Sequence, residues 1–148
     1  MFMRILLASV HLFGLGIGLG AIWTRGRALV SELDERALKR AFAADNFWAG
    51  AAGLWLATGL ARAFAGFEKG TAYYLNNSLF WLKMGLFVAI LALEVRPMIG
   101  LIGWRIRLKR NQSLDLRAAR SFGIVSHVQA GLLVAMVVVA CALARGCG

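Results

Sequence analysis

Apolar residues form four long runs along the 148-residue chain, and most of the charged residues lie between these runs. The runs cover residues 5–24, 46–66, 79–95 and 121–144 approximately. Each is close to the ~20 residues that a helix needs to cross a hydrocarbon layer of ~30 Å. The pattern predicts an all-α fold, an integral membrane four-helix bundle that forms one domain over residues 1–148.

The segment between the first two runs has a helical pattern of its own. Its start at Ser31 resembles a capping box, and its apolar residues repeat every three or four positions at Leu33, Ala37, Ala41 and Ala44. This predicts a short amphipathic helix over residues 32–44 on the inner membrane surface. Asp45 and Asn46 are then expected to cap the second membrane helix, and Pro97 is expected to stop or bend the third.

The composition supports a membrane location. Hydrophobic residues make up 60% of the chain, whereas soluble domains contain ~45–50% apolar residues. The first run is also longer than the ~7–15 apolar residues of a cleaved signal peptide. We therefore interpret it as a membrane helix of the mature chain.

The net charge of +10 is distributed unevenly along the chain. Five basic residues, Arg25 among them, lie in the first connection, and seven lie in the third. These two connections share one side of a four-helix bundle. Because lysine and arginine in loops favour the cytoplasm, both termini are expected outside, across a cell inner membrane. The basic surface is then expected to bind anionic lipid head groups rather than nucleic acid.

The segment from His11 to Gly20 has a glycine at every second position from 14 onward. Gly16 and Gly18 match part of a dinucleotide-binding fingerprint, but that motif needs a strand–turn–helix unit. An unbroken apolar run of membrane length leaves no place for such a turn. The glycines are instead expected to form packing faces that let helices approach closely. The predicted packing residues are Gly14, Gly16, Gly18, Gly20, Gly123 and Gly131.

Polar residues in or beside the runs fall at two depths. Arg62, Lys83 and Arg145 are expected near the outer face, with Lys69 close by, and the inner group consists of Asp45, Asn46, Glu94 and His127. One interpretation of the outer cations is that their long stems let the charges reach the interface. The other is an outward-facing pocket for an anionic group such as a carboxylate or a haem propionate.

The two histidines allow a haem hypothesis. Each has glycines on its own helix face, and neutral imidazole is a common ligand of haem iron. The predicted depths of His11 and His127 differ by roughly 10 Å, so ligation of haem b by His11 alone fits better than a shared haem. In the alternative interpretation His11 hydrogen-bonds across a helix interface, and His127 pairs with Glu94 or Ser126.

Several short motifs spread over nearly the whole chain occur together: Ala44-Asp-Asn-Phe-Trp48, Ala57-Thr-Gly-Leu-Ala-Arg-Ala-Phe64, Glu68-Lys-Gly-Thr-Ala-Tyr-Tyr74, Leu79-Phe-Trp-Leu-Lys83, Leu93-Glu-Val-Arg-Pro-Met98 and Ala144-Arg-Gly146. In this combination the chain resembles the bacterial membrane-protein family called domain of unknown function 2214. The resemblance implies a small four-helix inner-membrane protein without an assigned activity. Its motif residues include Arg62, Lys69, Lys83, Glu94 and Arg145. The architecture is more loosely similar to CopD-like and HemJ-type membrane proteins.

The sequence contains no nucleophile–base pair, carboxylate dyad or Cys/His metal set, so an enzyme is not favoured. We expect an accessory or structural subunit that packs into a larger membrane assembly or a homo-oligomer. The alternative is a redox module that holds haem b or a quinone near its outer face. In that case His11 would be the iron ligand, and the anionic groups would contact Arg62, Lys83 and Arg145, with His127 as a further cofactor residue.

Overall fold

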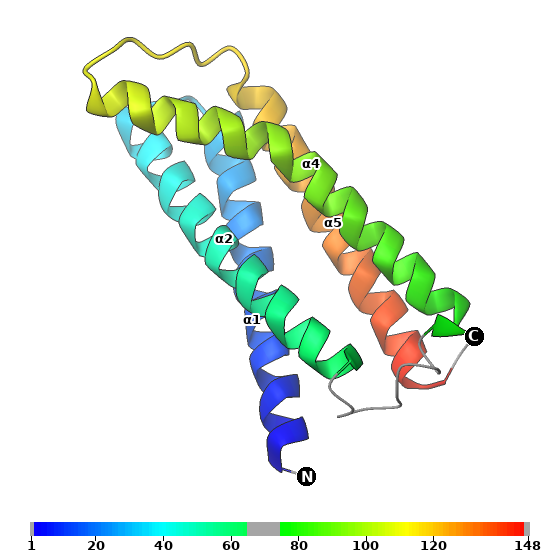
Figure 1. Ribbon diagram of the computed structural model, residues 1–148. Helices are drawn as coiled ribbons and strands as arrows, with labels where there is room; N and C mark the ends of the chain where they lie inside the picture. Colours follow the sequence, from blue (N-terminus) through cyan, green and yellow to red (C-terminus); the bar gives the residue numbers. More distant parts are fainter. Residues whose placement is uncertain (1, 65–74, 147–148) are drawn as a thin grey trace.

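The computed structural model describes residues 2–64 and 75–146 (Figure 1). These residues form α1 (Phe2–Val30), α2 (Glu35–Phe64), α4 (Ser78–Lys109) and α5 (Ala119–Ala144), with no strand among them. The predicted all-α fold is confirmed. Three of the helices, α1, α4 and α5, are long and apolar enough to cross a membrane. The remaining helix, α2, packs alongside α1.

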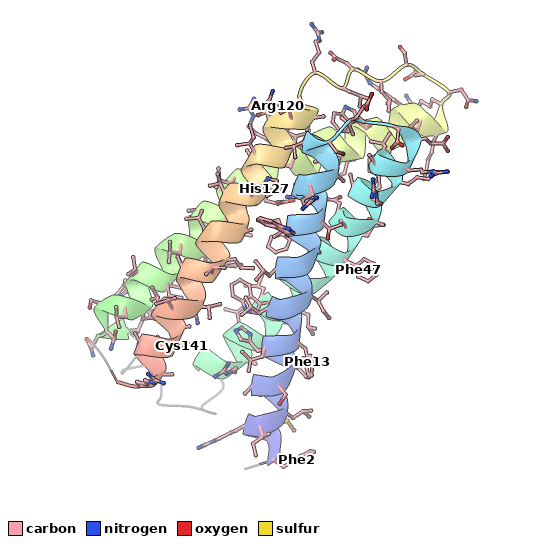
Figure 2. The ribbon with its side chains drawn as sticks, turned by 180° about the vertical axis from the view of Figure 1, so that it is seen from behind. Phe2, Phe13, Phe47, Arg120, His127 and Cys141 are labelled. Atoms are coloured by element: carbon pink, nitrogen blue, oxygen red, sulfur yellow. The ribbon has the colours of Figure 1, made fainter. Side chains whose placement is uncertain are left out.

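The bundle has two ends of different character. The beginning of α1 and the end of α5 lie at one end, which we call the terminal end (Figure 1). The opposite end carries the connections 31–34 and 110–118, and we call it the basic end. Figure 2 shows Arg120 at the basic end of α5 and Cys141 near the terminal end of the same helix. The basic residues of the first and third connections therefore share one end.

The prediction of a separate surface helix over residues 32–44 is wrong. Instead, α2 begins at Glu35 and continues without a break to Phe64. Asp34 caps it, because its carboxylate accepts a hydrogen bond from the Ala37 amide at 2.6 Å. Asp45 and Asn46 lie inside α2 and cap nothing, since no proline or turn residue interrupts the helical hydrogen bonds at that point.

The end of α4 also differs from the predicted one, because the helix continues through Pro97 to Lys109. Proline lacks the N–H that would bond to the Leu93 carbonyl, which permits a bend without ending the helix. In Figure 1 the later part of α4 turns across the basic end of α1 and α2. Leu101 and Trp104 from this part belong to a buried cluster with residues of α1, α2 and α5.

The helices pack in a defined order, with α1 against α2 and α5, and α5 against α4. Two apolar clusters lie inside the bundle. The cluster at the basic end contains Ala28, Leu29, Leu38, Ala41, Leu101, Trp104, Ala119 and Phe122. The central cluster contains Ala21, Ile22, Trp48, Ile90, Ala130, Leu133 and Met136. Exposed apolar side chains such as Phe13 and Val138 cover the outside, as expected for a lipid-facing surface.

The glycine-rich segment is continuous α-helix, which excludes the dinucleotide-binding turn. Its two glycine pairs separate onto different faces. A Cβ at Gly14 or Gly18 would contact α2, in the second case with Trp48 Cζ3 at 3.3 Å. Gly16 and Gly20 have nothing within 4 Å of a Cβ position, so they do not form an interface within the described chain.

The glycines of α5 divide in the same way. A Cβ at Gly123 would lie 2.6 Å from Val30 Cγ1 of α1, whereas nothing lies within 4 Å of one at Gly131. Two close contacts were not anticipated. A Cβ at Gly26 would lie 3.0 Å from the His127 ring, and one at Gly100 would lie 2.3 Å from the Phe122 ring. Packing glycines are thus those on the inner face of each helix.

Candidate functional site

The most buried charge in the described chain is Arg25 of α1, whose exposed fraction is 0%. It lies on the inner face of α1 between Ile22 of the central cluster and Leu29 of the cluster at the basic end. An unpaired guanidinium at this position would be very unfavourable, because charge is costly to remove from water. The surrounding polar side chains compensate for that cost.

All five N–H donors of the Arg25 guanidinium are used. The Glu94 carboxylate of α4 accepts from Nη1 and Nη2, both at 2.7 Å, in a bidentate pair. Asp45 of α2 accepts from Nη1 at 2.8 Å. Ser126 and Gln129 of α5 accept from Nε at 3.0 Å and from Nη2 at 3.1 Å. One arginine thus joins all four helices.

The network continues from Asp45 towards the basic end. Its second carboxylate oxygen accepts from Arg105 of α4 at 2.9 Å, and the same Arg105 nitrogen donates to the Phe42 carbonyl. Gln129 donates to Glu94 and to the Ile90 carbonyl. Two arginines and two carboxylates make the cluster electrically neutral. Among the described residues no buried side-chain nitrogen or oxygen lacks a partner. We call these six side chains (Arg25, Asp45, Glu94, Arg105, Ser126 and Gln129) the arginine network.

The hydropathy pattern places Arg25 in the first connection, because a charged residue ends an apolar run. A usable signal was nevertheless present. Gly18, Ile22, Arg25 and Leu29 recur every three or four residues, so Arg25 continues the inner face of α1. Asp45 and Glu94 stand out in the sequence as acidic residues in or beside the apolar runs, but the sequence does not indicate their common partner.

A cavity of about 300 Å³ occupies the terminal half of the bundle. This volume is at the lower limit of typical small-molecule sites. All four helices line the cavity, and the walls are mainly apolar, including Leu15, Phe80 and Met136. The central cluster lies between the cavity and the arginine network, since Met136 belongs to both the cluster and the cavity wall.

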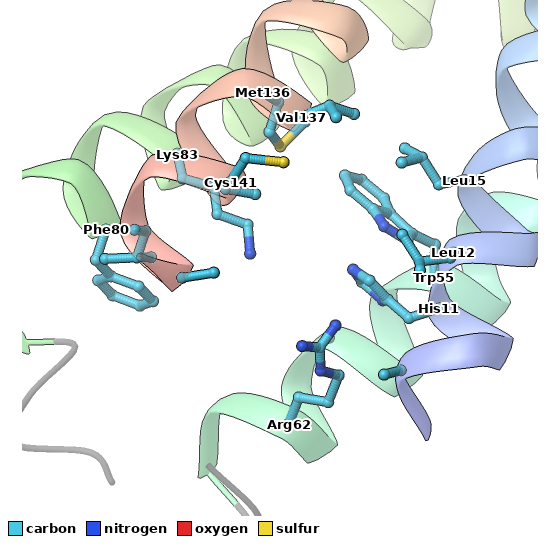
Figure 3. Close-up of a pocket in the computed structure, with 15 residues that line it drawn as sticks. His11, Leu12, Leu15, Trp55, Arg62, Phe80, Lys83, Met136, Val137 and Cys141 are labelled. Carbon is cyan, nitrogen blue, oxygen red and sulfur yellow. The ribbon is translucent and has the colours of Figure 1, made fainter. Parts of the chain in front are cut away.

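Three basic side chains from three helices converge on this cavity (Figure 3). They are His11 of α1, Arg62 of α2 and Lys83 of α4, all half-buried. The thiol of Cys141 on α5 lies on the same wall as Met136. Arg62 and Lys83 bring charged N–H donors to this mainly apolar space. The cavity is therefore suited to an anionic or hydrogen-bond-accepting oxygen.

The orientation of the His11 ring is set by Thr58. The distance from His11 Nδ1 to Thr58 Oγ1 is 2.9 Å. The Thr58 hydroxyl donates to the Leu54 carbonyl at 2.8 Å, so its oxygen accepts from an Nδ1–H. The Nδ1 proton of His11 therefore lies on the Thr58 side of the ring. The ring also stacks on Trp55, with centroids 5.5 Å apart. The expected hydrogen bond across a helix interface is confirmed.

A second hollow of about 90 Å³ extends this cavity sideways between α2 and α4. Both hollows share the side chains of His11, Trp55 and Lys83. The additional lining is apolar and consists of Leu56, Leu60, Met84 and Phe87. We call this extension the side gap.

The remaining predicted cofactor residues lie elsewhere. Arg145 follows the last turn of α5, is exposed, and does not line the cavity. Lys69 lies outside the described residues. His127 packs edge-on against Trp23, with ring centroids 4.9 Å apart. Both partners expected for His127, Glu94 and Ser126, instead bind Arg25.

The positions of the histidines rule out one haem shared between them. His127 packs against Gly26, which lies fifteen residues after His11 on α1. At 1.5 Å per residue this corresponds to about 22 Å along the helix, roughly twice the expected separation. Among the described residues no three His, Cys, Asp or Glu side chains come together as a metal site.

Comparison with known proteins gives a family but no activity. No curated protein and no solved structure matches this chain, so the looser similarity to CopD-like and HemJ-type proteins gains no support. The family model described as "Predicted membrane protein (DUF2214)" matches residues 3–148. Because this match covers almost the entire sequence, the chain belongs to the DUF2214 family of predicted membrane proteins.

Proposed function

We propose that the protein binds an amphiphilic molecule with an anionic oxygen head in the cavity of its terminal half. The observation that carries this proposal is the convergence of Arg62 and Lys83, from α2 and α4, on one mainly apolar space. Cations are costly at membrane depth and usually mark a functional site. Apolar walls with a few convergent polar groups are typical of ligand sites.

The arginine network supports this proposal by joining the four helices at the other half of the bundle. It joins α1, α2, α4 and α5 through Arg25, so the helices are held together near the basic end. The cavity between them lies towards the terminal end. In this proposal the network is structural, and it positions the walls that carry His11, Arg62 and Lys83.

Removal of the Lys83 charge is expected to weaken binding of an anionic head selectively. Hydrogen bonds to charged groups contribute about 1.5–3 kcal/mol, so Lys83→Met should weaken dodecanoate binding about 10- to 100-fold. Dodecanol, with the same tail and no charge, should bind the wild-type protein and the variant equally. Displacement of tritiated dodecanoate from detergent-solubilised protein measures both ligands. Lys109→Met, at the exposed end of α4, is the matched control. Equal dodecanoate binding by wild type and Lys83→Met would contradict the proposal.

A haem b or quinone module is the redox form of the same proposal. Thr58 orients the His11 ring through Nδ1, so Nε2 is the nitrogen that would ligate iron. Arg62 and Lys83 would contact propionates or a quinone oxygen. An absorption spectrum of the protein expressed with excess haem decides the haem form. A Soret band that shifts in His11→Ala supports it, and no Soret band rejects it.

An accessory role in a membrane assembly is a second candidate, and the outer face of α2 favours it. Small exposed residues follow this face at Ala49, Gly50, Gly53 and Ala57, and the amide of Asn46 is exposed on the same helix. Small residues and an amide are typical of contacts between membrane helices. A substitution at the predicted packing residue Gly18 would not test this role, because Gly18 packs against α2 of the same chain.

Substitution on the outer face of α2 should separate an assembly without unfolding the chain. Asn46→Leu and Gly50→Leu are expected to reduce a complex to the single chain on a native gel. The first removes an amide that could bind a partner helix, and the second adds bulk that prevents close approach. Gly16→Leu on α1, also exposed and without a neighbour, serves as the control for added bulk. Unchanged migration of both α2 variants would argue against an assembly through this face.

For orientation, we propose that the basic end faces the cytoplasm, with both termini outside the inner membrane. Exposed arginines and lysines at that end, including Arg36, Lys39 and Arg110, fit the positive-inside rule and contact with anionic lipid head groups. A cysteine introduced as Ser113→Cys, in a chain with its natural cysteines replaced by serine, should react with an impermeant thiol reagent only after the membrane is permeabilised. Reaction in intact cells would reverse the orientation.

A further inference from the structure

The side gap opens on the lipid-facing surface between α2 and α4. On the α2 side, Leu56 and Leu60 line it while remaining 40% and 51% exposed. On the α4 side, Met84 and Phe87 complete an apolar lining. A hollow whose wall residues also face outward connects the cavity with the surroundings of the bundle.

The side gap lies inside the lengths of α2 and α4, away from their ends at the terminal end of the bundle. Met84 lies six residues after the start of α4 at Ser78, which corresponds to about 9 Å along the helix. Leu60 and Leu56 precede Arg62 by two and six residues, away from the terminal end. With α4 spanning a membrane, the gap would open among lipid tails, while Arg62 and Lys83 lie at the cavity end of the same space.

We propose that the ligand has one hydrocarbon tail, which passes through the side gap into the bilayer while its carboxylate head lies between Lys83 and Arg62. This proposal rests on the proposed function, because it needs an anionic head in the cavity. The apolar lining of Leu60, Met84 and Phe87 matches a hydrocarbon chain. The volume of the gap, about 90 Å³, is small and matches one hydrocarbon tail better than two. The ligand class is a fatty acid or a similar single-tailed acid that enters from the membrane.

Substitutions that narrow the side gap test whether the ligand tail passes through it, which we call the tail path. Met84→Trp and Leu60→Trp fill it from opposite walls, so the result does not depend on the folding of one variant. Each is expected to weaken binding of tritiated palmitate about tenfold, which corresponds to lost contact for about two methylene groups. Hexanoate has the same head and a short tail that remains in the cavity, so its affinity should stay within about twofold. Leu82→Trp, exposed on another face of α4, controls for an added indole.

The outcomes separate the two proposals. Loss of palmitate binding in both gap variants, with hexanoate binding retained, supports a tail in the side gap. Unchanged palmitate binding in both gap variants overturns the tail path and leaves the anion site intact. If the wild-type protein binds neither acid, or if Lys83→Met retains full affinity for both, the proposed function fails and the tail path fails with it.

Discussion

Glu94→Gln is expected to destabilise the protein by about 3–5 kcal/mol, because it leaves the buried Arg25 guanidinium without its bidentate counter-ion. Glutamine keeps the shape of the side chain but removes its charge. Arg25 would then share Asp45 with Arg105, and the cluster would carry one uncompensated positive charge. Unfolding in mixed detergent micelles, followed by tryptophan fluorescence, measures the loss.

The exposed pair of Glu35 and Lys39 provides the control for this substitution. These side chains are joined at 2.6 Å but are 81% and 75% exposed. Glu35→Gln should therefore change the free energy of unfolding by less than about 0.5 kcal/mol. A similar small effect of Glu94→Gln would mean that the arginine network does not hold the bundle together.

A paired substitution distinguishes charge balance from simple loss of contacts. Arg25→Met with Glu94→Leu removes one cation and one anion, and it leaves the Asp45–Arg105 pair intact. Replacing a buried ion pair with apolar side chains is often close to neutral. The double variant should therefore be more stable than Glu94→Gln alone. A double variant that loses the sum of both single effects would contradict this role of the charges.

Gly123→Ala should destabilise the protein by about 1–3 kcal/mol, although alanine is the better helix former. The added Cβ would lie 2.6 Å from Val30 Cγ1 and 3.0 Å from the Gly26 carbonyl oxygen. Because one of these neighbours is backbone, α1 and α5 must move apart. That movement would also stretch the bond from Arg25 to Ser126, one turn from Gly123.

Gly131→Ala on the same helix is the matched control. Nothing lies within 4 Å of its Cβ position, so helix propensity alone should act and stability should be unchanged or higher by up to about 1 kcal/mol. The two alanines are thus expected to have opposite effects in the same unfolding measurement. Destabilisation by both, or by neither, would mean that close contact at Gly123 does not control the α1–α5 interface.

The helical bundle was predictable from the sequence because apolar runs of membrane length leave the backbone few alternatives. The ends of the helices were not. Hydropathy changes at the membrane boundary, whereas hydrogen bonding along the backbone does not, so α2 extends back to Glu35 and α4 extends forward to Lys109. For the same reason the expected break at residue 45 does not occur, and near Pro97 α4 bends rather than stops.

Residue types alone indicate which side chains are costly to place in a membrane, but not which of these side chains contact one another. The sequence predicts the same depth for Arg62 and Lys83, and the structure brings them together with His11 at one cavity. Arg145 has the same predicted depth but does not line the cavity, because depth does not determine the rotation of a helix. Arg25 was missed because its charge ended an apolar run, although its spacing from Ile22 continued the buried face. Spacing was the better guide at that position.

Native mass spectrometry of the protein extracted gently from its own membrane tests the central claim most directly. We expect one bound single-tailed acid per chain of the wild-type protein, retained in Lys109→Met and lost in Lys83→Met. The mass of the bare chain in all three proteins, or a ligand that Lys83→Met retains unchanged, would contradict a cavity that binds an anionic amphiphile.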